Sequence, residues 1–479
     1  MKAKHFPIFL CILLLALASL ACEAMASGDP TEAPDSATST PASEEEATPT
    51  QRADLPELPE AISSEGAGMA CLGLRDGGIS CLDDDDEWQT YNTENSDLPS
   101  NYVSNGAICP DDRLAVAHFD GVSLFDGEEW EQIEKSEDFT SADAIACGED
   151  NEIWIAHFKG VSRYADEEWT NYGSSNLATG DSANDLVYDI AIDEDGKVWA
   201  VTSRSVALFE DDEWTIFQKG DGFEQDMFFD ALVLDSSGRP WVAYSAGVAV
   251  YENDQWHLIE KEGYDTVKSM TFDANGNLWL ATLTNGASVY DGSTWKTYTL
   301  DDDKTIPSEQ VNSIVGDSQG RVWLGTTYGL AVFDDDEWTT YRMDNADLGD
   351  NLIEFVAVVK DGPEIPEADR KAEASLTGVL EDEDEEALAD TRVEICVEPL
   401  GTTFAGDTPC SEQPFFLSTT SNDDGEFTFN DVPPGYYVLV AETDSGWVQL
   451  TDQFGIGSER TLVEEGEEYD IGTLSVTKD

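Results

Sequence analysis

Two histidines at equivalent positions of an internal repeat are the side chains best suited to chemistry in this sequence. His118 and His157 lie beside predicted hairpin turns, and two neighbouring imidazoles could bind a metal ion or act as acid and base. The alternative is that both are turn residues without a chemical role. The chain has four histidines in all, and it contains no G-x-S-x-G, P-loop or H-E-x-x-H motif. Catalysis therefore has few candidate residues.

A wider set of side chains shares the same kind of turn. In a four-stranded antiparallel unit, the turns between the second and third strands fall on one face together with the loops between units. The repeated acidic turns fall on the opposite face, and varied residues replace a recurring Thr on the less acidic one. We therefore predict that the less acidic face binds the ligand. Its candidate residues are His118, His157, Lys159, Arg204, Tyr244 and Tyr328.

Three acidic residues near the C-terminus are a candidate cation site. Asp423, Asp424 and Glu426 could hold Ca²⁺ with help from backbone carbonyl groups, because oxygen atoms are the ligands that Ca²⁺ prefers. The run Asn-Asp-Asp-Gly over 422–425 is also a plain hairpin turn, which is the alternative. No other cofactor is expected.

Six of the eight cysteines remain once Cys11 in the apolar N-terminal segment and Cys22 beside it are set aside. An even number in an exported chain indicates disulfides. Pairing neighbours gives Cys71 with Cys81 in one hairpin, Cys109 with Cys147 on adjacent units, and Cys396 with Cys410 around one loop. Free buried cysteines are the alternative, and the absence of a C-x-x-C motif disfavours a metal site.

The elements that position these residues are repeats of about 42 residues. Each unit contains four short β-stretches separated by turn signals, which is typical of a β-propeller blade. One set of tryptophans follows the acidic turns, namely Trp88, Trp130, Trp169, Trp214, Trp256, Trp295 and Trp338. A second set lies in the second strand of the unit, namely Trp154, Trp199, Trp241, Trp279 and Trp323. We expect this second set to pack between neighbouring blades.

The first unit supplies only three strands, and the apolar run 352–359 supplies the missing one from the other end of the repeats. We predict that this run joins the N-terminal unit and closes the ring, because closure removes the free sheet edges of an open array. The predicted fold is all-β, with a seven-bladed propeller over 61–362 that is closed by three strands plus one.

The repeats resemble those of the two-component regulator propeller family. The pattern V-N-S-I-x-x-D-x-x-G-x-V-W-L-G-T-x-x-G-L-x-x-F, from Val311 to Phe333, carries the resemblance. It implies a ligand-sensing or ligand-binding propeller, often the periplasmic part of a sensor kinase, although this sequence contains no kinase segment. A second resemblance, to streptogramin B lyases, would give His118 and His157 a catalytic role.

The C-terminal part is predicted to be a separate domain. Residues 363–373 form a linker, and 374–479 contain the short alternating strands of a β-sandwich. The segment 419–440, with its G-x-F-x-F and V-P-P-G-x-Y motifs, resembles carboxypeptidase regulatory-like domains of the prealbumin type. The resemblance implies a spacer or adhesion unit without catalysis.

Residues 1–21 have a positive start, an apolar run and a small-residue end, as a signal peptide does. The following Cys22 makes this segment resemble a bacterial lipobox, in which the cysteine is acylated. Cleavage near Ala24–Ala26 by an ordinary signal peptidase is the alternative. Residues 22–60 are rich in Pro, Ser, Thr and acidic residues and lack aromatics, which predicts a disordered tether. We expect an exported, lipid-anchored protein of the bacterial cell envelope or surface.

The net charge of −77, from 101 acidic and 24 basic residues, excludes nucleic acids and anionic membrane surfaces as partners. Membrane contact is expected through the N-terminal lipid only, and the body is expected to be monomeric. The predicted function is non-enzymatic recognition of an extracellular glycan, peptide or protein. The alternative is a propeller lyase or hydrolase that uses the histidines named above. A high-salt habitat is a second explanation of the acidic excess.

Overall fold

The computed structural model describes residues 68–476 except 83–86, 135–141, 150–151, 178–185, 224–226, 264, 301–305, 360–361, 364–365, 367–370, 383–384, 398–407, 412, 444–445 and 451–459. The predicted signal peptide, Cys22 and the tether over 22–60 lie outside the described residues. Within the described ranges the chain is almost entirely β-structure, and no helix there is long and apolar enough to cross a membrane.

Seven four-stranded antiparallel sheets precede position 360 in the described chain, and each has the form of a propeller blade. Blade 1 contains β28 (Ile353–Val359), β1 (Met69–Leu74), β2 (Ile79–Leu82) and β3 (Trp88–Tyr91); blade 2 contains β4 (Val103–Ile108), β5 (Leu114–His118), β6 (Gly121–Phe125) and β7 (Trp130–Glu134); blade 3 contains β8 (Ala144–Cys147), β9 (Ile153–His157), β10 (Gly160–Ala165) and β11 (Glu168–Tyr172), followed by the short helix α1 (Ser174–Leu177). Blade 4 contains β12 (Val187–Ile192), β13 (Val198–Thr202), β14 (Val206–Glu210) and β15 (Glu213–Phe217); blade 5 contains β16 (Phe229–Leu234), β17 (Pro240–Tyr244), β18 (Gly247–Glu252) and β19 (Gln255–Glu260). Blade 6 contains β20 (Val267–Phe272), β21 (Leu278–Thr282), β22 (Ala287–Tyr290) and β23 (Trp295–Tyr298); blade 7 contains β24 (Val311–Gly316), β25 (Val322–Thr326), β26 (Gly329–Asp334) and β27 (Glu337–Tyr341).

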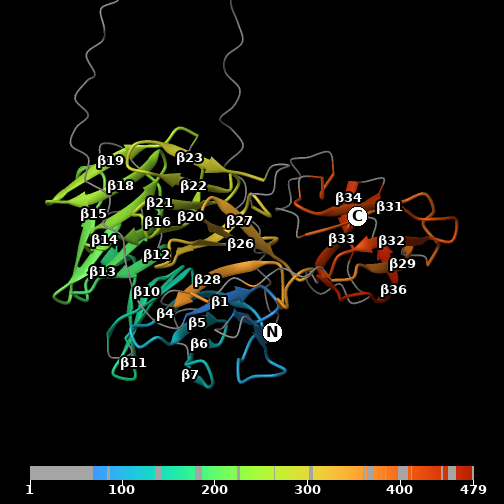
Figure 1. Ribbon diagram of the computed structural model, residues 1–479, viewed down its shortest axis with the longest axis horizontal. Helices are drawn as coiled ribbons and strands as arrows, with labels where there is room; N and C mark the ends of the chain where they lie inside the picture. The colour runs from blue at the N-terminus through green and yellow to red at the C-terminus, as the bar shows by residue number, and fades with distance from the viewer. Residues whose placement is uncertain are drawn as a thin grey trace, which may run out of the picture. The chain divides into compact units, whose positions relative to one another are not determined.

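The innermost strands of the blades lie side by side around a channel. Each of β4, β8, β12, β16, β20 and β24 contacts the innermost strand of the next blade, and β28 contacts both β24 and β4. In Figure 1 the orange β28 lies beside the blue β1, with which it pairs. Since the strands alternate in direction, the turns between second and third strands share one face with the loops between blades, which we call the loop face. The other turns form the acidic face.

The second strand of each blade is buried along nearly its whole length, because neighbouring blades cover both of its faces. Trp154, Trp241, Trp279 and Trp323 of these strands are among the largest fully buried side chains, as the repeat predicts. Six of the seven fourth-strand tryptophans lie directly opposite an aromatic residue of the third strand, and the seventh, Trp88, lies opposite Leu82. Trp338 lies in this way on Phe333, with 4.9 Å between the ring centroids. Indole packing therefore joins both strands and blades.

An aspartate in the turn between the first and second strands organises blades 5, 6 and 7. Asp317 accepts hydrogen bonds from the backbone N–H groups of residues 319 and 321 at 3.0 and 2.9 Å. It also accepts from Arg321 Nε at 2.6 Å and from Trp323 Nε1 at 2.9 Å. The Asp317 side chain is fully buried, and the Arg321 side chain is 5% exposed. The motif D-x-x-G-x-x-W thus fixes the turn, the start of the second strand and the buried indole together.

The same interaction recurs in two neighbouring blades. Asp235 accepts from Trp241 Nε1 at 2.9 Å, and Asp273 accepts from Trp279 Nε1 at 3.0 Å. In blade 3, Gly148 occupies the position of the aspartate, six residues before Trp154. The buried Trp154 indole N–H has no hydrogen-bond partner among the described residues. The missing carboxylate explains the unpartnered indole.

The three disulfides predicted by pairing neighbouring cysteines are confirmed. They join Cys71 to Cys81, Cys109 to Cys147, and Cys396 to Cys410. Disulfides persist in oxidising compartments, so the described domains are typical of an exported protein. The disulfide between Cys109 and Cys147 links blades 2 and 3 at the turns between their first and second strands. Neither turn has the aspartate, because Cys109 occupies its position in blade 2 and Gly148 in blade 3.

The C-terminal part forms two sheets on one shared core. The first has the order β32 (Glu426–Val432), β29 (Ala374–Asp382), β36 (Glu468–Val476); the second has the order β31 (Phe416–Thr420), β30 (Arg392–Cys396), β33 (Gly435–Thr443), β34 (Gly446–Gln449), with β35 (Thr461–Val463) pairing β33. Leu376 and Phe427 from the first sheet and Ile395 and Tyr437 from the second are buried in the same cluster. This part is therefore all-β, like the part before it.

Asp317→Ala is expected to destabilise the protein strongly, because it leaves the buried Arg321 guanidinium without its carboxylate. Breaking a buried ion pair from one side costs about 3–5 kcal/mol, and denaturant unfolding measures the change. Asp334→Ala, at an exposed position of the same blade, is the matched control and should stay within about 0.5 kcal/mol of the parent. Equal stability of the two variants would contradict a structural role for the turn aspartate.

Candidate functional site

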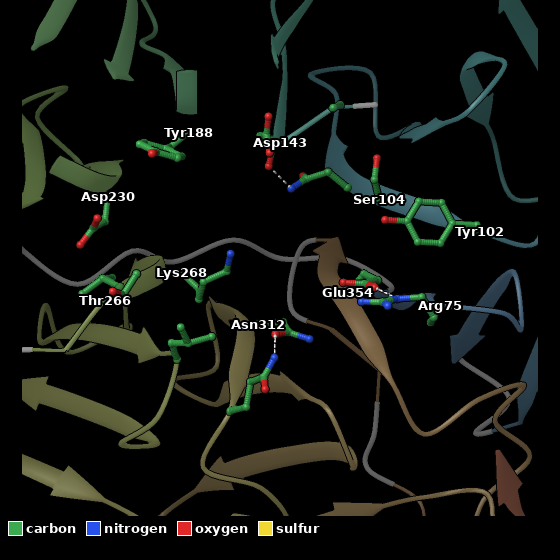
Figure 2. A pocket seen from close by; sticks show the side chains of 15 residues that line it. Arg75, Tyr102, Ser104, Asp143, Tyr188, Asp230, Thr266, Lys268, Asn312 and Glu354 are labelled. Carbon is green, nitrogen blue, oxygen red and sulfur yellow. Dashed lines mark hydrogen bonds and ion pairs between the residues drawn. The ribbon is translucent and has the colours of Figure 1, made fainter. Parts of the chain in front are cut away.

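A polar cavity of about 590 Å³ lies at the loop-face mouth of the channel (Figure 2). Its walls come from the starts of the innermost strands and from adjacent loops. The lining residues are Arg75, Tyr102, Ser104, Asn105, Ala142, Asp143, Tyr188, Asp230, Thr266, Val267, Lys268, Leu283, Gln310, Asn312 and Glu354. The volume is large enough for a small ligand or for one end of a longer one.

A repeated irregularity at the start of the innermost strand supplies a lining residue in six of the seven blades, and in blade 3 Asp143 directly precedes β8. The pairing register shifts just after Val103, Val187, Phe229, Val267 and Val311, and near Ile353 in β28. A bulge of this kind re-aims the side chain at the shift. The residues at or beside this position, which we call the inner ring, are Ser104, Asp143, Tyr188, Asp230, Lys268, Asn312 and Glu354.

In several blades, the residue directly after the inner-ring residue forms a hydrogen bond to the innermost strand of the next blade. Asn105 Nδ2 donates to the carbonyl of Asp143 at 2.9 Å, and Asp189 accepts from the Leu232 N–H at 2.8 Å. Ser313 Oγ accepts in the same way from the N–H of residue 356 at 3.0 Å. These hydrogen bonds hold the innermost strands at fixed spacing. The inner ring is therefore carried by a rigid frame.

Charged groups lie on opposite sides of the cavity. Arg75 forms an ion pair with Glu354, and its guanidinium carbon lies 5.8 Å from the centroid of the Tyr102 ring. Figure 2 shows Tyr188, Asp230 and Lys268 on the side away from this pair. The lining residues carry three carboxyl groups and two cationic groups. The cavity can therefore offer hydrogen-bond donors, acceptors and both signs of charge.

The blades around the mouth perturb the acid–base properties of two inner-ring residues. Water reaches Asp143, but partial burial in the channel raises the pKa of its carboxyl to about 6, against a lowering effect of the Lys268 ammonium. Burial also raises the pKa of the Tyr188 hydroxyl, and the nearby carboxylates of Asp230 and Asp143 add to the rise. Lys268 thus acts electrostatically on Asp143, and both Asp143 and Asp230 act on Tyr188.

Exposed aromatic side chains border the same mouth. Tyr102, Phe119, Phe158 and Phe228 are 40%, 59%, 47% and 51% exposed. Phe119 directly follows His118, the last residue of β5. Leu283 has the equivalent place after β21 and lines the cavity, so Phe119 lies at the same mouth. Phe158 has this place in blade 3, and Phe228 precedes β16 as Tyr102 precedes β4. We call these four residues the aromatic rim.

The two histidines predicted as a reactive pair are buried at the ends of separate second strands. His118 Nε2 lies 2.7 Å from Ser123 Oγ, and His157 Nε2 lies 2.9 Å from Ser162 Oγ. Each Nδ1 accepts a backbone N–H two residues later at 3.2 Å, which assigns the ring proton to Nε2. Neither imidazole lines the cavity. Both fasten the hairpin in which they lie.

The other four predicted loop-face residues take two kinds of position. Lys159 Nζ lies 5.4 Å from the Phe158 ring centroid, and the Arg204 guanidinium carbon lies 4.9 Å from that of Phe228. Tyr244 and Tyr328 are buried, at 2% and 5% exposure. Lys159 and Arg204 therefore belong to the edge of the aromatic rim. Tyr244 packs in the cluster between blades 4 and 5, whereas the Tyr328 ring stacks on Phe415 with 6.1 Å between the ring centroids.

The predicted calcium residues lie in a turn organised by an amide. Asn422 Oδ1 accepts from the N–H groups of Asp424 and Glu426 at 3.0 and 2.9 Å, and Asn422 Nδ2 donates to Glu426 Oε2 at 2.9 Å. The neighbouring Asp423 is exposed. Among the residues that the structure describes, no three His, Cys, Asp or Glu side chains are grouped to hold a metal ion. The hairpin-turn interpretation accounts for these contacts.

The inner ring was not among the residues predicted from the sequence, although the sequence carries a signal for it. In the repeat V-N-S-I, a buried apolar residue, which is valine in four blades and Phe229 in blade 5, is followed by a polar residue that differs among these blades: Ser104, Tyr188, Asp230, Lys268 and Asn312. A variable polar position beside a buried apolar one inside a repeat indicates a surface that is not used for packing.

Comparison with known proteins supports the repeat type. Residues 305–328 match the family model described as "Two component regulator propeller". No curated protein matches the chain in sequence.

Several solved structures are similar to part of this chain. One is the extracellular domain of BT4673 from B. thetaiotaomicron, described as a hybrid two component system, with TM-score 0.44, 17% identity and coverage of 57% of this chain and 39% of that one. PorZ of the Porphyromonas gingivalis type-IX secretion system has TM-score 0.45, 14% identity and coverage of 82% and 63%. Virginiamycin B lyase from Staphylococcus aureus has TM-score 0.44, 11% identity and coverage of 54% and 89%. The chain spans less than two thirds of the first two, and likenesses of this size carry no argument about function.

Lys268→Met is expected to raise the pKa of Asp143 above its value of about 6, because it removes the cation that favours the carboxylate. Carbon-13 NMR of the Asp143 carboxyl measures the change. Lys296→Met, at an exposed position of β23, is the control and should leave the pKa of Asp143 unchanged.

The same group contributes to the pH dependence of stability. The folded protein binds the Asp143 proton more tightly than the unfolded chain, whose aspartates have a pKa of about 4. The contribution of Asp143 to stability is therefore fully present below pH about 4 and is lost as pH rises through about 6. Asp143→Asn should remove this part of the pH dependence in denaturant unfolding. An unaltered profile would show that the channel does not perturb the carboxyl.

Proposed function

We propose that this protein is a non-catalytic, exported binding or sensing protein whose ligand enters the loop-face mouth of the channel. One observation carries the proposal. Each blade contributes one polar inner-ring residue to a cavity of about 590 Å³, and these seven residues are of six types. The residues beside them are used for packing and for bonds between blades. A position that is fixed in space and free to vary in chemistry is suited to recognition. The ligand class is an extracellular glycan, peptide or protein segment.

The arrangement of the histidines favours binding over turnover. His118 and His157 hydrogen-bond to serines inside their own hairpins. An acid or base must come within hydrogen-bond reach of the substrate atom that it protonates or deprotonates, and neither imidazole lines the cavity. The lyase or hydrolase alternative would therefore need a site built from other residues.

The proposal includes the architecture around the site. The seven sheets are the blades of one propeller closed by β28, and the two C-terminal sheets form a β-sandwich of carboxypeptidase regulatory-like type that acts as a spacer. Acylation of Cys22 would hold a monomeric body near the cell envelope through the tether over 22–60. Disulfides across three parts of the chain support the exported location.

A binding screen tests the proposal. The purified chain is exposed to arrays of glycans, peptides and small polar compounds, and hits are measured by calorimetry. Thr266→Trp, which fills the cavity from its wall, should reduce binding by about tenfold or more. Thr170→Trp, at an exposed position of β11, should not.

Two results would count against the proposal. Equal binding by Thr266→Trp and Thr170→Trp would move the site away from the channel mouth. Conversion of the ligand to a product during incubation, recorded by mass spectrometry, would replace the binding function with an enzymatic one.

A further inference from the structure

We propose that the cavity binds the protonated amino group of a peptide N-terminus between Asp143, Tyr188 and Asp230, with the first apolar side chains of the peptide on the aromatic rim. This inference rests on the proposed function, because it names the ligand of the same cavity. It follows from the distribution of charge inside the mouth, from the sign of the surrounding field and from the position of the exposed aromatics.

The charge inside the mouth is uneven. Arg75 is engaged with Glu354 on one side of the cavity. On the other side, Tyr188 lies between the inner-ring residues of the two adjacent blades, Asp143 and Asp230, and both carboxylates act on its hydroxyl. Lys268 is the second cationic group of the lining, against three carboxyl groups. The region around Tyr188 therefore carries the excess negative charge of the cavity.

A primary ammonium group matches this region. It has three N–H donors and no acceptor, so carboxylates and a phenolic oxygen, which accept hydrogen bonds, suit it chemically. Hydrogen bonds between charged groups are stronger than neutral ones. The net charge of −77 attracts cations to the protein and repels anions. A carboxylate or phosphate group would meet repulsion both at long range and at this position.

The aromatic rim gives the ligand its second feature. Phe228 lies two residues before Asp230, and Phe158 belongs to the same blade as Asp143. The two acids are thus each accompanied by an aromatic side chain that is about half exposed. Exposed rings of this size are sites of apolar contact with a partner. A peptide places an apolar side chain within a few ångströms of its terminal ammonium, whereas a simple polyamine has none.

Short peptides with a free N-terminus and Leu or Phe in the first two positions are the probes, each paired with its N-acetylated form, and spermidine is the third arm. Calorimetry on the purified full chain should show binding of the free peptides and a loss of about tenfold or more on acetylation. Asp143→Asn and Asp230→Asn should each weaken binding of the free peptides. Asp166→Asn, the same change at an exposed turn of the acidic face, should have no effect.

The arms separate the possible sources of the amine. Weak spermidine binding, together with loss of peptide affinity in Phe158→Ala or Phe228→Ala, supports the peptide. Spermidine binding as tight as that of the peptides, unaffected by these two variants, would overturn it. Equal binding of free and acetylated peptides would overturn the ammonium subsite while leaving the channel-mouth function intact. If no peptide binds but a glycan does in the wider screen, the ammonium subsite is likewise overturned and the channel-mouth function is kept.

Discussion

The buried aspartate of the turn between the first and second strands is the interaction on which the blade depends. A carboxylate withdrawn from water needs several donors, and Asp317 has them in two backbone N–H groups, Arg321 and the Trp323 indole. The indole held in this way is the side chain that packs between blades. One group of hydrogen bonds therefore connects the turn to the second strand and the second strand to the neighbouring blade. Where Cys109 and Gly148 replace the aspartate, a disulfide links the same two turns.

The inner ends of the blades divide structural and recognition roles among consecutive residues. In blade 4, Val187 is fully buried, Tyr188 lines the cavity, and Asp189 accepts a hydrogen bond from Leu232 of blade 5. Blades 6 and 7 have a serine at the position of Asp189, and it accepts the equivalent hydrogen bond. An acid at this buried position is harder to ionise, and burial raises the pKa of the Asp189 carboxyl to about 7. Because Val187 packs in the core and Asp189 bonds to the next blade, Tyr188 is not needed for either role. Chemical variety at the mouth is therefore compatible with a regular frame.

Much of the fold follows from the repeat, whereas the site does not. The tryptophan spacing and the cysteine pairs could be predicted because equivalent positions in a repeat have equivalent surroundings. The side chain of Asn312 could not be placed by strand alternation, since the register shift beside it interrupts the period of two. His118 and His157 were candidates for chemistry because of their type and position. A serine five residues after each, at 123 and 162, was the signal that they serve as hydrogen-bonding partners within a hairpin.

The cationic side chains of the loop face affect both the charge at the channel mouth and the exposure of the rim aromatics. In a chain with 24 basic residues against 101 acidic ones, Arg75, Lys159 and Arg204 each lie on an aromatic residue of the rim. In each contact the cationic side chain covers part of the ring, while its charged group stays in water. They also weaken the negative field at the mouth, so that a ligand is not held by net charge alone. Selection then depends on whether one donor-rich group reaches the carboxylates around Tyr188 while the rest of the ligand contacts the rings.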